Sequence, residues 1–273
     1  MSRRQLQSES TRYGRSFDFL LAIPLAVYTV IVILLVSSLV LKITPSAILS
    51  AVTDSNILDS IILSFVTSLI SSLLSVAVAV PAGYILSRNR FPGRSIVDGL
   101  LDLPIALPPL VMGLALLVFF NTSAGRWIDR AVEGGVFVYR PGGIVLVQFI
   151  IGCALSVRVM RSGFDAVDAR YEDVAMALGA NRWQSFIKVA VPAAGSSIVA
   201  SAVISWARIF GLFGPIILLC GTIRGRTEIM PTTIFLEAQT GRIDVALVMG
   251  ACMIIASMVA LAIYKRIGGK TFS

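Results

Sequence analysis

Six stretches of the chain are apolar over a length that can cross a lipid bilayer. A membrane helix needs about 20 mostly apolar residues, at a rise of about 1.5 Å per residue. The pattern predicts an all-α membrane protein with about six spanning helices. We expect the first run to be retained, because it is longer than the core of a signal peptide. The runs cover residues 18–41, 59–86, 100–120, 142–160, 195–220 and 244–264.

The third apolar run is interrupted by residues that do not suit a straight helix. Its sequence, LLDLPIALPPLVMGLALLVFF, contains Pro104, Pro108, Pro109 and Gly113. Each proline removes a backbone donor and clashes with the preceding turn, so this helix must kink or break. Broken backbone at membrane depth is tolerated only where protein or a watery cavity satisfies it. A packing kink would explain one proline, but three within six residues favour a hinge or a pathway-lining segment.

Lysine and arginine are unevenly distributed between the two sets of loops. Fifteen of the 23 lie at the termini and in the loops 87–99 and 158–192, and seven lie in the opposite set. The positive-inside rule therefore places both termini and the 158–192 loop in the cytoplasm. This gives a cytoplasmic tail over 1–17, a membrane domain over 18–264 and a second tail over 265–273.

Composition removes several classes of function. The chain is 56% hydrophobic and 14% charged, with a net charge of +8. Because the basic excess lies mainly in one set of loops, it is a topology signal and not a nucleic-acid footprint. The chain has no histidine, and its three cysteines stand singly in apolar runs. We therefore expect no metal site, no disulfide framework, no histidine-based catalysis and no bound cofactor.

The longest polar segment after the N-terminus is YEDVAMALGANRWQSFIKVAVP, residues 171–192. Its first half fits a short helix with Glu172 and Asp173 in the first turn, where the helix dipole favours acidic residues. Gly179 is typical of a residue that ends a helix in a left-handed conformation. A second short helix would carry an apolar face that consists of Trp183, Phe186 and Ile187. We expect this face to be buried, either in the base of this protein or in a partner.

This segment resembles the EAA motif of permease subunits of ATP-binding cassette importers. That pattern reads E-A-A, three residues, G, nine residues, I, one residue and L-P. Here Asp173, Val174 and Ala175 fall on E-A-A, Gly179 on the glycine, and Val189 with Val191-Pro192 on the end. The substitutions keep charge or apolar character, and both intervals match. The place in a cytoplasmic loop, two spans before the C-terminus, is also that of the family.

The resemblance implies a type I importer permease fold whose 161–192 loop docks, as a coupling helix, into an ATPase dimer. It further implies a second permease copy, an extracytoplasmic substrate-binding protein and the bilayer of the cytoplasmic (inner) membrane. The GGKT sequence at Gly268–Thr271 lacks the earlier glycine and the following helix of a phosphate-binding loop. The chain is therefore no enzyme itself, and ATP and Mg are used by the ATPase. The implied coupling residues are Glu172, Asp173, Val174, Ala175, Leu178, Gly179, Trp183 and Pro192.

Two softer resemblances concern the transported substrate. Residues 100–117 and 205–235 are similar to spans of molybdate, tungstate and sulfate permeases, although Leu212 stands where the molybdate group often has an acid. Iron and polyamine permeases share part of these patterns. The resemblance implies uptake of molybdate or tungstate, with sulfate next. We assign to the translocation pathway Pro104, Pro108, Pro109, Gly113, Arg208, Gly211 and Gly214.

Arg208 leaves two interpretations open. A charge inside a span is costly, so it should face a cavity or a partner. It could offer a positive potential to an oxyanion, or pair with a carboxylate or with carbonyls of the broken third span. In the external loop, Arg224, Arg226 and Glu228 either touch the binding protein or are simply solvated.

Two other functional classes make different demands on the sequence. A secondary transporter would need intramembrane carboxylates, for which Asp102 is the nearest candidate. A membrane enzyme would need clustered acid and base groups, which the sequence lacks.

Overall fold

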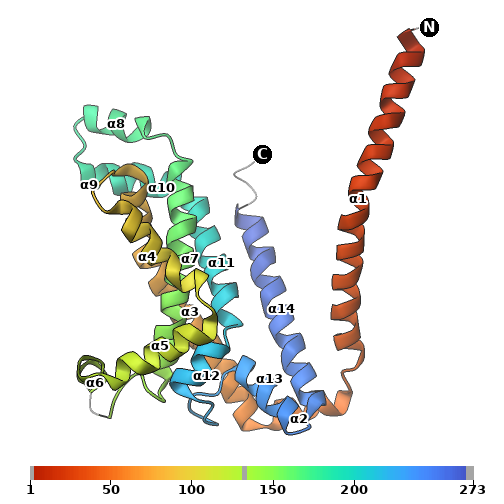
Figure 1. The fold of residues 1–273 in the computed structure, drawn as a ribbon, viewed down its shortest axis with the longest axis vertical. Helices are drawn as coiled ribbons and strands as arrows, with labels where there is room; N and C mark the ends of the chain where they lie inside the picture. Colours follow the sequence, from red (N-terminus) through yellow and green to blue (C-terminus); the bar gives the residue numbers. More distant parts are fainter. Residues whose placement is uncertain (1–2, 131–133, 269–273) are drawn as a thin grey trace.

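The computed structural model describes residues 3–130 and 134–268, and every regular element in these residues is a helix (Figure 1). The predicted all-α fold class is thereby confirmed. In the tail, residues 269–273, including most of the GGKT sequence, lie outside the described residues. The elements are α1 (Arg3–Leu41), α2 (Pro45–Thr53), α3 (Ser55–Arg88), α4 (Arg94–Ala106), α5 (Pro109–Asn121), α6 (Ser123–Asp129), α7 (Pro141–Asp165), α8 (Arg170–Ala177), α9 (Arg182–Ser185), the π-helix η1 (Phe186–Ala190), α10 (Val191–Ala193), α11 (Gly195–Phe210), α12 (Gly214–Cys220), α13 (Met230–Gln239) and α14 (Ile243–Gly268).

Four helices in the described residues are long and apolar enough to cross a membrane by themselves. Two further spans are bent pairs: α4 with α5, at 109°, and the 182–193 segment with α11, at 67°. Counting each bent pair as one span gives the six that the sequence predicts. The four single helices are Phe19–Leu41, Ser55–Arg88, Pro141–Asp165 and Ile243–Arg266.

We expected the fifth apolar run to form one helix, but the structure divides it into two. α11 ends at Phe210, and α12 begins four residues later at Gly214. Pro215 lies in the first turn of α12. In a continuous helix its ring would clash with the carbonyl of Gly211, and the bond to that carbonyl would be lost. The break therefore has the same cause as the break that we predicted for the third run.

α3 packs against α7 and α11 through a stripe of small hydroxyl side chains. Small polar residues let membrane helices approach closely. The Ser71 hydroxyl donates to the Val145 carbonyl of α7 at 3.1 Å, and Ser72 donates to the Ala202 carbonyl of α11 at 3.0 Å. The stripe consists of the buried residues Ser60, Ser64, Thr67, Ser68, Ser71, Ser72 and Ser75.

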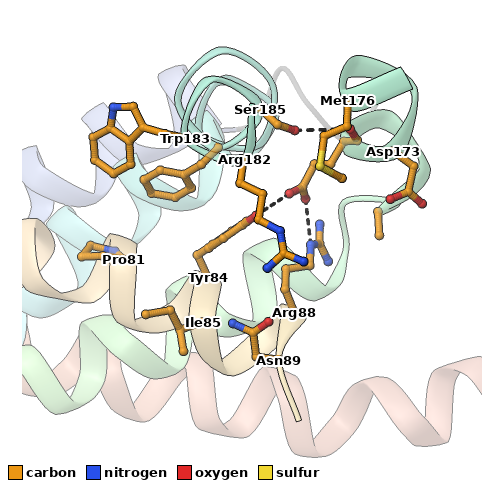
Figure 2. Close-up of a pocket in the computed structure, with 13 residues that line it drawn as sticks. Pro81, Tyr84, Ile85, Arg88, Asn89, Asp173, Met176, Arg182, Trp183 and Ser185 are labelled. Carbon is orange, nitrogen blue, oxygen red and sulfur yellow. Dashed lines mark hydrogen bonds and ion pairs between the residues drawn. The ribbon is translucent and has the colours of Figure 1, made fainter. Parts of the chain in front are cut away.

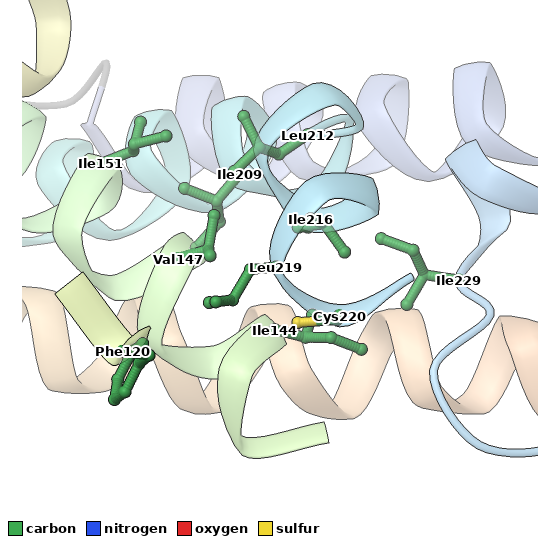
Figure 3. Packing of buried hydrophobic residues seen from close by; sticks show 10 residues of the cluster. All are labelled: Phe120, Ile144, Val147, Ile151, Ile209, Leu212, Ile216, Leu219, Cys220 and Ile229. Carbon is green, nitrogen blue, oxygen red and sulfur yellow. The ribbon is translucent and has the colours of Figure 1, made fainter. Parts of the chain in front are cut away.

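An apolar cluster fixes the broken spans beside α7 (Figure 3). It draws on α5, α7, α11 and α12, so residues far apart in sequence share one core. Leu212, at the position where the molybdate group often has an acid, is buried in this cluster. Its members are Phe120, Ile144, Val147, Ile151, Ile209, Leu212, Ile216, Leu219, Cys220 and Ile229.

The short helices lie at the two ends of the bundle (Figure 1). α8, α9 and α10 form one end, toward which the start of α1 and the end of α14 also point, while α2, α6 and α13 lie at the other. α1 stands apart from the bundle and contacts α14, and its spanning part leaves no residue buried. The cytoplasmic assignment of the α8 end stays a prediction.

Candidate functional site

The 171–192 segment forms two short helices around Gly179, as the sequence predicts. Gly179 has a φ of +95°, in the left-handed region that favours glycine. The Gly179 amide donates to the Met176 carbonyl, and the Ala180 amide to the Ala175 carbonyl, both at 3.0 Å. This pair of bonds is a Schellman motif, which satisfies the last carbonyls of α8. The chain reverses here and α9 begins.

The second helix is capped at its start and irregular at its end. The Asn181 side chain accepts from the Gln184 amide at 2.8 Å, and the Gln184 side chain accepts from the Asn181 amide at 3.0 Å. This reciprocal capping box satisfies two free donors. After Ser185 the chain widens into η1, and it returns to α-helix beside Pro192, which has no amide to donate.

The outer face of the two helices is apolar and exposed. Leu178 is 85% exposed and Trp183 is 67% exposed. Of the apolar face predicted for the second helix, only Phe186 is packed within the chain, with its ring 4.6 Å from that of Tyr84. An exposed apolar group on an otherwise polar loop is typical of a contact surface. We call the following set the docking face: Tyr171, Val174, Leu178, Trp183 and Ile187.

Adjacent acidic residues of α8 have opposite surroundings (Figure 2). Asp173 is exposed, whereas Glu172 is 5% exposed and turns inward to the end of α3. The Tyr84 hydroxyl donates to Glu172 Oε2 at 2.6 Å, and Arg88 Nε donates to Glu172 Oε1 at 2.8 Å. The sequence suggested a dipole role for Glu172 and, by resemblance, a place among the coupling residues, but not these two partners, which lie more than 80 residues earlier.

A cavity of about 580 Å³ separates the loop from the end of α3. It lies between α3, α8 and α9 and is lined by both apolar and charged groups, among them Arg88, Glu172, Arg182 and Trp183 (Figure 2). The loop is therefore not seated on a filled apolar core at this point. Its remaining coupling residues, Val174, Ala175 and Pro192, are exposed or half-buried.

The two broken spans cross each other close to their breaks. A Cβ atom on Gly113 of α5 would lie 2.5 Å from Pro215 Cα of α12, and one on Gly214 would lie 3.2 Å from the Leu110 side chain. Gly113 and Gly214 thus permit a close crossing. The structure therefore brings together two residues that we assigned to the pathway, Gly113 and Gly214. Four other assigned residues are half-buried or exposed: Pro104, Pro108, Pro109 and Gly211.

Arg208 lies two residues before the break after α11, and it is exposed. Within residues 19–130 and 134–266, no hydrogen bond or ion pair involves its guanidinium, so the structural partner that we considered is not seen. Ile204 and Gly211 share its exposed helix face. Asp102, the candidate for ion coupling, is already paired with Arg158 Nη2 at 2.8 Å.

An ionic network at the opposite end was missed by sequence reasoning. Arg224 Nη2 donates to Glu237 Oε1 at 2.9 Å, and Arg242 pairs with the second oxygen of Glu237. Glu228 is also buried, its nearest cation is Arg224 at 3.9 Å, and burial raises the pKa of its carboxyl. Arg224 therefore holds this loop against α13, and Glu228 is buried beside it, so neither residue is simply solvated. Arg242 lies only five residues from Glu237 in the sequence, but the burial of Glu237 arises from tertiary packing and left no local signal.

The described residues thus form a helical protein with up to six candidate membrane spans, two of them bent, and a polar loop with exposed apolar side chains. The sequence profile of the binding-protein-dependent transport system inner membrane components matches residues 79–272. The chain therefore belongs to this family of multi-pass inner membrane proteins, whose members are not themselves catalytic.

Relatives of this chain carry names of oxyanion permeases. The chain is 33% identical over 180 residues to the sulfate permease CysT of Escherichia coli K12, covering 65% of this chain and 64% of CysT. It is 38% identical over 140 residues to the molybdate/tungstate permease WtpB of Thermococcus kodakarensis, covering 51% of each. It is 33% identical over 159 residues to the molybdenum permease ModB of E. coli K12, covering 58% and 69%. The matches thus span between half and two thirds of the first two relatives.

Solved structures share the fold at low identity. A bacterial alginate ABC transporter chain superposes with a TM-score of 0.75 at 17% identity, covering 98% of this chain and all of that one. The methionine transporter MetNI gives a TM-score of 0.60 at 12% identity, covering 78% and 95%. The predicted importer permease fold is thereby confirmed.

Proposed function

We propose that this chain is the transmembrane subunit of an ATP-driven importer and forms the route for an oxyanion, most specifically molybdate or tungstate. Sulfate is the alternative substrate, and the similar identities to CysT and WtpB support both. The docking face is the observation that supports this proposal most directly, since Leu178 is 85% exposed on an otherwise polar loop. Such a surface suits the groove of an ATPase subunit.

The proposed assembly has two permease copies, an ATPase dimer and an extracytoplasmic binding protein. The family description supports the binding protein. Movement of the docking face would switch the spans between inward-facing and outward-facing states. The spans would thus form a two-state element whose equilibrium is shifted by the distant ATPase. A secondary transporter is the less favoured alternative, because Asp102 is engaged by Arg158.

Arg208 is our candidate contact for the oxyanion. An unpaired guanidinium at this depth is costly in lipid, so the face of Ile204, Arg208 and Gly211 should line a watery cavity. A second copy of the chain would close that cavity and place two guanidinium groups around it. Guanidinium groups bind oxyanions through parallel hydrogen bonds.

The test of this function is uptake in cells that lack their own molybdate, tungstate and sulfate importers. We expect the wild-type chain, expressed with its ATPase and binding protein, to restore accumulation of molybdenum, tungsten or sulfur, measured by mass spectrometry, and to co-purify that ATPase. Leu178→Asp should abolish both, because a carboxylate cannot enter an apolar groove without a partner. Leu178→Met, which keeps the apolar surface, is the matched control. Undiminished uptake by Leu178→Asp would rule out the proposed docking.

A further inference from the structure

Within the loop that carries the docking face, Phe186 and Ala190 pack in an apolar cluster with α3 and α7, whereas no residue of α8 belongs to that cluster. α8 packs against α9 and η1, which belong to the same loop. The cavity of about 580 Å³ lies where apolar side chains could otherwise fill the space between this loop and α3. The link between α8 and α3 therefore depends on polar side chains that reach across.

Glu172 makes that link with both carboxylate oxygens. Oε1 accepts from Arg88 at 2.8 Å and Oε2 accepts from Tyr84 at 2.6 Å, so the carboxylate is held in one orientation. The donors lie one turn apart at the end of α3. Charge-assisted hydrogen bonds of this length are stronger than neutral ones and fix direction as well as distance.

Arg88 also fixes the chain just before α8. Its Nη2 donates to the Val167 carbonyl at 2.8 Å, while its Nε holds Glu172. The Ser185 hydroxyl adds a bond to the Glu172 carbonyl at 3.4 Å, which ties α9 to the same point. Arg88, at the end of α3, is thus bonded both to the chain just before α8 and to the first turn of α8.

We propose that the Glu172–Arg88–Tyr84 cluster is the joint through which movement of the docking face reaches α3. Glu172 is then a positioning residue that acts inside the permease, while its exposed neighbour Asp173 faces the partner. The inference rests on the proposed ATPase docking. α3 packs against both α7 and α11, so a displacement of its end is passed to two other spans.

The joint is tested with the permease–ATPase complex purified through a tag on the permease and reconstituted into liposomes. Glu172→Gln keeps the size of the side chain but removes its charge. We expect the ATPase to co-purify in the wild-type ratio and to hydrolyse ATP, while oxyanion transported per ATP falls about tenfold or more. A merely structural role would lower the amount of complex without changing that ratio.

Tyr84→Phe provides a milder variant if Glu172→Gln fails to fold. It removes one hydrogen bond and leaves the ion pair, so transport per ATP should fall by about two- to threefold. The matched control is Asp102→Asn, which breaks the exposed Asp102–Arg158 pair at the same end of the bundle. We expect this control to keep the wild-type ratio.

Two results would overturn the joint. One is an unchanged ratio of transport to hydrolysis in both Glu172→Gln and Tyr84→Phe. The other is loss of the ATPase from Glu172→Gln, which would make Glu172 part of the docking contact. Failure of the proposed function looks different, because the wild-type chain would then co-purify no ATPase at all.

Discussion

Two buried carboxylates at the α13 end of the bundle are in opposite electrostatic situations. Glu237 receives Arg224 and Arg242, whereas Oε2 of Glu228 has no hydrogen-bond partner among the described residues. Together with Asp54, which lies 3.7 Å from Arg242, the network has three acids and two cations. Neutralising one acid therefore has a different consequence at each position.

Glu237→Gln should lower the free energy of unfolding by about 1 kcal/mol, because it weakens the charge-assisted bonds to two half-exposed guanidinium groups, whose charge water partly screens. Glu228→Gln should be neutral or stabilising, since it removes an unpaired buried charge. Thermal unfolding of the purified protein in detergent distinguishes the two. Equal losses would contradict the assigned pairing.

The pH dependence of the Glu228 variant follows from the raised pKa of this carboxyl. The folded state keeps a proton that the unfolded chain releases, so stability from Glu228 declines as the pH rises above the ordinary value of 4.5. Glu228→Gln removes this decline. We expect the difference in melting temperature, variant minus wild type, to increase as the pH is raised from 5 to 8.

At the scale of elements, the sequence predicted the position of one break and not of the other. Three prolines marked the third run, and the structure breaks there between Ala106 and Pro109. The fifth run contains only Pro215, and its apolar residues continue on both sides. Its break arises because, in a continuous helix, the ring of Pro215 would clash with the carbonyl of Gly211 four residues earlier. The crossing of the two breaks depends on tertiary packing, which no local pattern encodes.

Gly113 sets how near α5 and α12 can lie. Gly113→Ala would bring a methyl group within 2.5 Å of the backbone of Pro215, so we expect a loss of about 1–3 kcal/mol in stability. Gly99→Ala is the matched control in α4, where a Cβ would meet nothing within 4 Å. It should gain up to about 1 kcal/mol. Thermal unfolding that ranks the two in the reverse order would refute the close crossing.

For the whole molecule, hydropathy was sufficient to predict the number of spans, whereas the docking role of the loop is a prediction from its resemblance to the EAA motif. Spanning length and the positive-inside rule are properties of single segments, so they can be read from one sequence. The Glu172–Arg88 contact joins segments 84 residues apart, and the burial of Glu237 depends on α13 folding onto α3. Neither leaves a periodicity, and both therefore required the structure.

The orientation of the whole bundle is tested by cysteine labelling in intact cells, after the three native cysteines are replaced by alanine. A cysteine at Leu178 should react with a membrane-impermeant maleimide only after the cells are opened. A cysteine at Arg226 should react from outside. Labelling of both from one side would refute the topology.

The hydroxyl stripe of α3 has a consequence for biogenesis. Four of its seven hydroxyls donate to carbonyls of α3 itself, at Ile57, Ser60, Leu63 and Phe65. These groups are satisfied before any other helix is present, and the span still has a mean hydropathy of 2.3. α3 can therefore leave the translocon and enter lipid alone, although α7 and α11 are synthesised later. Insertion and assembly of this subunit are therefore separable steps, and α3 can be inserted before its partner helices have been synthesised.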